Sequence, residues 1–88
     1  MTNTDVARQL QLFAHALAER PGNLYRVRAY RRAACTLLGL DRPVSELRTG
    51  ELEALPGIGD HLAATISNYA RTGEWKTHDE LASTNLAV

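Results

Sequence analysis

The chain has 88 residues, 44% hydrophobic and 23% charged, and its zero net charge excludes strong nucleic-acid binding through bulk charge alone. This length predicts one domain over residues 1–88, with a core at about residues 5–82, because a second core would need a longer chain. No apolar run approaches the roughly 20 residues of a membrane helix, and the polar start is unlike a signal peptide, so we expect a cytoplasmic protein without a membrane partner.

The first expected element is an amphipathic helix over residues 4–19, with Asn3 or Thr4 as its cap and Pro21-Gly22 as its end. Its apolar side chains recur at four, three and four residues, which places them on one stripe. These residues are Val6, Leu10, Phe13 and Leu17.

A second helix is expected to begin at about Leu24 or Val27 and to end at Leu38, with Gly39 as the terminating residue. Its lone cysteine, Cys35, reads as a small buried hydrophobe, since one cysteine builds neither a disulfide nor a zinc site.

Charge is distributed unevenly, because residues 20–48 carry seven arginines against two acids while both flanking segments are net acidic. Such a basic block presents a phosphate-binding surface even on a neutral protein. The alternative is a solvated helix face, with surface ion pairs such as one from Arg31 or Arg32 to Asp41.

The second half of the chain predicts short helices separated by tight turns. Ser45 begins a helical turn, residues 50–55 form a short helix, and residues 60–71 form a longer helix closed by Thr72-Gly73. A final turn at residues 79–83 is capped by Thr77 with Glu80, before frayed residues 83–88. Trp75 is expected to plug the core against the first helix, while His15 and His78 lie at the surface. No strand pattern is visible, so the predicted class is all-α.

The most informative segment is the turn Pro56-Gly-Ile-Gly59 between two of these helices. Gly57 and Gly59 permit a positive φ and leave no Cβ in the way of a ligand, while Ile58 plugs into the core. The amides of residues 57–61 then open the following helix, where unpaired N–H groups and the helix dipole favour an anion such as a backbone phosphate. Asp60 is expected either to border that anion or to cap the helix.

Two strings, LYRVRAYRRAA at residues 24–34 and LPGIGDHLAATI at residues 55–66, resemble the amino-terminal domain of X-family DNA polymerases such as DNA polymerase beta. The resemblance covers roughly residues 5–82. It implies a compact domain of four to five helices with one helix-hairpin-helix motif, which binds the 5′-phosphate side of nicked or gapped DNA.

The same resemblance bears on chemistry. The family's Schiff-base lysine falls at Thr65, which has no amine, so we expect no enzyme activity. Other family positions for phosphate contact fall at Arg26, Tyr30, His61 and Thr77. The hairpin of the family also holds a monovalent cation, Na or K, through backbone carbonyls, which here are those of Glu53, Leu55 and Ile58; no other cofactor is expected.

The predicted function is therefore DNA binding without sequence specificity, through backbone phosphates at nicked, gapped or 5′-phosphate ends in DNA repair, with a protein partner in repair left open. The alternatives are a protein-interaction module that kept the fold, and a 5′-deoxyribose phosphate lyase that uses Lys76 or the N-terminal amine. The predicted phosphate-binding residues are Gly57, Ile58, Gly59, Asp60, His61, Arg26, Arg28, Tyr30 and Arg31.

Overall fold

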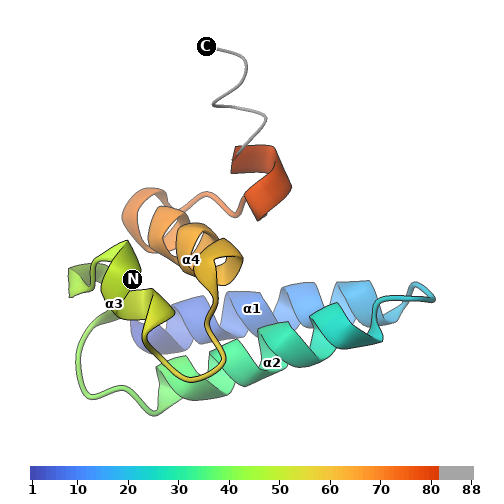
Figure 1. The fold of residues 1–88 in the computed structure, drawn as a ribbon, viewed down its shortest axis with the longest axis horizontal. Helices are drawn as coiled ribbons and strands as arrows, with labels where there is room; N and C mark the ends of the chain where they lie inside the picture. The colour runs from blue at the N-terminus through green and yellow to red at the C-terminus, as the bar shows by residue number, and fades with distance from the viewer. Residues whose placement is uncertain (82–88) are drawn as a thin grey trace.

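A computed structural model of the chain describes residues 1–81, and all regular secondary structure in that range is helical (Figure 1). The elements in chain order are α1 (Asn3–Ala18), α2 (Leu24–Leu38), the 3-10 helix η1 (Val44–Glu46), α3 (Thr49–Glu53) and α4 (Asp60–Thr72). The radius of gyration is 12.5 Å, close to the roughly 12 Å of a compact chain of this length. The predicted compact all-α class is confirmed, and no helix within residues 1–81 is both long and apolar enough to cross a membrane.

The start of α1 differs from the expected one. Thr2 is the cap: its hydroxyl accepts from the Asp5 amide at 3.1 Å, and the Asp5 carboxylate accepts from the Thr2 amide at 2.8 Å. The prediction of Asn3 or Thr4 was wrong because this reciprocal pair satisfies two helix-end donors with a cap one or two residues earlier. The same bonds, that from the Thr2 amide above all, lower the pKa of the Asp5 carboxyl, so the cap weakens only when pH falls through that lowered value.

Helices α1 and α2 run side by side and bury the core between them (Figure 1). Val6 and Leu10 are fully buried, and Phe13 packs edge-on to Tyr30 with ring centroids 4.9 Å apart. Trp75 lies 5.3 Å from Phe13, which confirms it as a plug against the first helix.

Cys35 is exposed, so the prediction of a buried cysteine was wrong. Helix α2 turns Ala33, Ala34 and Leu37 inward, and position 35 falls on the opposite side of the cylinder.

Asn3 instead fastens the loop after α2. Its side-chain amide donates to the Arg42 carbonyl at 2.8 Å, and its oxygen accepts from the Val44 amide at 2.7 Å. The 3-10 turn therefore begins at Val44 after Pro43, one residue before the Ser45 that we expected to start it.

Helix α4 packs against α3, η1 and α1. Through its contact with α1, the second half of the chain packs against the α1–α2 pair. It begins at Asp60 and ends at Thr72, and the next residue, Gly73, has a φ of 77°, the left-handed conformation typical of a helix stop. The chain then returns through Trp75 to a helical turn that begins at His78, where the Glu80 carboxylate accepts from the Thr77 amide at 3.4 Å. The predicted end of this turn and the predicted fraying lie at residues 82–88, outside the described residues.

Candidate nucleic-acid interface

The turn between α3 and α4, residues 56–59, packs on α2 (Figure 1). The Thr36 hydroxyl donates to the Pro56 carbonyl at 2.8 Å, and Ile58, 3% exposed, enters the core. Gly57 adopts a φ of 78°, which an L side chain rarely takes. These contacts hold the turn, residues 56–59, in one position on α2.

The two glycines of the turn differ, which the sequence did not reveal. Gly59 has a φ of −90° and a ψ of −175°, ordinary extended backbone, so the prediction of a shared need for positive φ holds for Gly57 alone. Apart from Gly59 itself and its two chain neighbours, no heavy atom of residues 1–81 lies within 4 Å of a Cβ placed on Gly59. The packing of the described residues therefore gives no reason for glycine at position 59.

Only part of the predicted row of amide donors is free. The Ile58 amide donates to the Leu55 carbonyl at 3.2 Å, and the His61 amide donates to the Asp60 carboxylate at 2.9 Å. Among the described residues, no acceptor meets the amides of Gly57, Gly59 and Asp60. Unpaired amides at the start of a helix are suited to an oxyanion.

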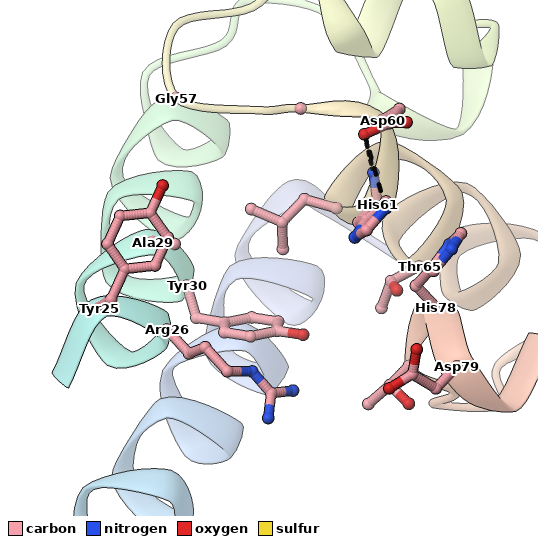
Figure 2. A pocket seen from close by; sticks show the side chains of 13 residues that line it. Tyr25, Arg26, Ala29, Tyr30, Gly57, Asp60, His61, Thr65, His78 and Asp79 are labelled. Carbon is pink, nitrogen blue, oxygen red and sulfur yellow. Dashed lines mark hydrogen bonds and ion pairs between the residues drawn. The ribbon is translucent and has the colours of Figure 1, made fainter. Parts of the chain in front are cut away.

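A pocket of about 370 Å³ opens beside these amides. Figure 2 shows Arg26 and Tyr30 reaching into it from α2, opposite His61 and Thr65 of α4. The turn and the helical turn after α4 complete the wall. The full lining is Tyr25, Arg26, Ala29, Tyr30, Gly57, Gly59, Asp60, His61, Leu62, Thr65, Thr77, His78 and Asp79.

A family model for a helix-hairpin-helix domain matches residues 1–75. The chain belongs to this helix-hairpin-helix family. Such domains generally bind DNA without sequence specificity, through phosphates that position the protein on the duplex. A search of curated proteins gave no match to the chain.

The helix-hairpin-helix fold gathers most of the predicted phosphate-binding set around one pocket. Arg26 and Tyr30 line this pocket together with four predicted residues of the second half of the chain, Gly57, Gly59, Asp60 and His61. Arg28 and Arg31 are exposed on α2 away from the pocket lining, and Ile58 contributes packing from inside the core. Neither Arg31 nor Arg32 forms an ion pair with Asp41 in the described part of the chain, so the expected example of a surface ion pair was wrong, while the solvated helix face stays an alternative.

Asp60 is not the helix cap, since Gly59 holds that position and Asp60 is the first residue of α4. Its carboxylate nevertheless accepts a hydrogen bond from the His61 amide and lies 3.9 Å from the His61 imidazole (Figure 2). The acid thus occupies one of the donors predicted for the phosphate.

His78 was expected at the surface but is half-buried, and its ring stacks on that of His61 with centroids 3.8 Å apart and planes 5° from parallel. Sequence reasoning missed it because the two histidines are 17 positions apart and meet only when the chain returns after Trp75. Tyr25, 86% exposed at the rim of the pocket, was missed for a similar reason: no apolar pattern marks an exposed aromatic.

The carbonyls expected to hold a monovalent cation lie in and just before the turn. That of Leu55 accepts one hydrogen bond, from the Ile58 amide, and a carbonyl oxygen has a second lone pair for a cation. The donor set therefore suits Na or K in its chemistry, and the cation stays a prediction.

Proposed function

We propose that this chain binds DNA without sequence specificity by seating a backbone phosphate in the pocket beside the turn, and that it does so at nicked, gapped or 5′-phosphate ends during DNA repair. The observation that carries the proposal is the convergence of unpaired turn amides with Arg26, Tyr30 and His61 on one pocket. Amides and a guanidinium together supply hydrogen bonds and charge to the same oxyanion.

The concave shape of the pocket supports a strand end as the preferred target. Three segments wall it: α2, the turn with the start of α4, and the turn after α4. A terminal phosphate enters such a hollow freely, whereas an internal phosphate brings chain on both sides. The resemblance to the amino-terminal domain of X-family polymerases supports the same preference.

We propose further that the domain is not a lyase. Thr65, at the position of the family's Schiff-base lysine, is 1% exposed and borders the pocket with a hydroxyl in place of an amine. Lys76 lines a different hollow, with Asn68 and Arg71, and its ammonium lies 3.6 Å from the Glu74 carboxylate. Lys76 is therefore separated from the pocket in which a bound phosphate and its sugar would lie.

The proposal is tested by titrating the chain with intact, nicked and one-nucleotide-gapped duplexes, each with a 5′-phosphate or a 5′-hydroxyl, at two salt concentrations. We expect the gapped 5′-phosphate duplex to bind most tightly. The logarithm of its binding constant should fall linearly with the logarithm of the salt concentration, with a slope of about −0.9 per phosphate contacted. Equal binding of all six duplexes would remove the preference for ends. Absence of any salt-sensitive binding would remove DNA binding itself and leave a protein-interaction module.

Substituting Asp60→Asn is expected to tighten DNA binding about two- to fivefold at low salt. Asparagine keeps an oxygen for the His61 amide but removes a negative charge beside the proposed phosphate. Fluorescence anisotropy at low and high salt measures the change, with Glu53→Gln, an exposed acid at the end of α3, as the matched control. An affinity for Asp60→Asn at or below that of the wild type would show that no phosphate sits near this carboxylate.

A further inference from the structure

Arg32 lies against the turn at Gly57 and is not among the residues that line the pocket. A Cβ placed on Gly57 would lie 2.8 Å from the Cγ, Cδ and Nε atoms of Arg32, so the arginine stem passes directly over the glycine backbone. Arg32 does not line the pocket, whereas Gly57 does. Gly57 therefore contacts both the pocket and the side chain of Arg32.

Within residues 1–81, the Arg32 guanidinium has no acidic partner. The ion pairs of the described residues involve His15, Arg42, His61 and Lys76 as the basic members, and Arg32 is exposed and in none of them. Helix α2 itself contains no acid. A cation placed against a turn with unpaired amides, and without a neutralising neighbour, is suited to an anion that also contacts the turn.

Resting on the proposed DNA binding, we propose that Arg32 binds a second phosphate of the same DNA strand, next to the one seated in the pocket. The strand would then cross Gly57, with its terminal phosphate toward the pocket and the next phosphate along the strand toward Arg32. This accounts for an arginine that lies against the turn without an acidic partner among the described residues.

A purely structural role is the competing explanation, in which the stem of Arg32 only packs on the turn. Substituting Arg32→Met separates the two roles, because methionine retains most of an apolar stem and loses the charge. We expect Arg32→Met to keep the thermal midpoint of the wild type, to lower DNA affinity about three- to thirtyfold, and to reduce the salt slope by about 0.9, the value for one lost phosphate contact. Arg32→Lys is expected to retain the slope, since it restores a point charge.

Arg71→Met is the matched control, because Arg71 lies at the end of α4 and lines other hollows; its salt slope should equal that of the wild type. If the wild type binds DNA with a normal salt slope and Arg32→Met has the same slope, the Arg32 inference is wrong and the proposed function stands. A lowered thermal midpoint with an unchanged slope likewise assigns Arg32 to packing alone. Absence of salt-sensitive binding by the wild type would overturn both.

Discussion

Substituting Gly59→Ala is expected to weaken DNA binding about tenfold or more while the domain remains folded. The backbone at Gly59 is extended, so alanine is accommodated without strain, and an added Cβ meets no atom of residues 1–81 beyond Gly59 and its chain neighbours. Because Gly59 borders the pocket and its amide is unpaired, the methyl group would stand where the phosphate oxygen approaches. A tenfold loss of affinity corresponds to about 1.4 kcal/mol of binding free energy.

The measurement pairs anisotropy on a gapped 5′-phosphate duplex with a thermal melt of each variant. Gly50→Ala is the control: its Cβ also meets nothing, but it lies in α3 and away from the pocket. Gly57 is a poorer choice for this test, since its φ of 78° adds about 1–2 kcal/mol of backbone strain for alanine and its Cβ strikes Arg32. Wild-type affinity in a folded Gly59→Ala domain would mean that the phosphate is not bound at this face of the turn.

The helices were predictable because their apolar residues repeat at helical spacing. The pattern from Val6 to Leu17 located α1, and the glycines at positions 39 and 73 located the ends of α2 and α4. The caps were less predictable, because several polar residues compete for each helix start and hydrogen-bond geometry decides among them. Thr2 and Asp5 are three residues apart and form the cap of α1. Asn3 does not cap the helix, because its side chain is hydrogen-bonded to the distant loop at Arg42 and Val44.

The residues of the candidate site were also predictable only in part. The resemblance to X-family polymerases placed Arg26 and Tyr30 in the predicted phosphate-binding set, and both border the pocket, since residues four apart share one stripe of α2. The choice among the other arginines depends on where the turn crosses α2, which is a tertiary contact fixed by Thr36 and Pro56. No periodicity along α2 distinguishes Arg32 from Arg28 before that crossing point is known.

Substituting Ile58→Ala is expected to be among the most destabilising changes in this domain, lowering the free energy of unfolding by about 2–5 kcal/mol, whereas Ile58→Val should lower it by about 0.5–1.5 kcal/mol. Ile58 is 3% exposed and belongs to the same buried cluster as Leu52 and Ile66, so truncation leaves a cavity under the turn. Urea unfolding followed by circular dichroism gives the three free energies. Leu38→Ala, at a half-exposed leucine of α2, is the control and should change stability by about 0.5 kcal/mol or less.

The Ile58 series also tests how the site is built, because the unpaired amides of Gly57 and Gly59 flank this side chain. If Ile58 holds them in place, DNA affinity should fall in the order wild type, valine, alanine, even at temperatures where each variant is fully folded by circular dichroism. Binding would then depend on a buried side chain that contacts no DNA, acting through the position of the turn on α2. An Ile58→Ala domain that is folded and binds like the wild type would show instead that the Thr36–Pro56 hydrogen bond and Arg32 fix the turn by themselves.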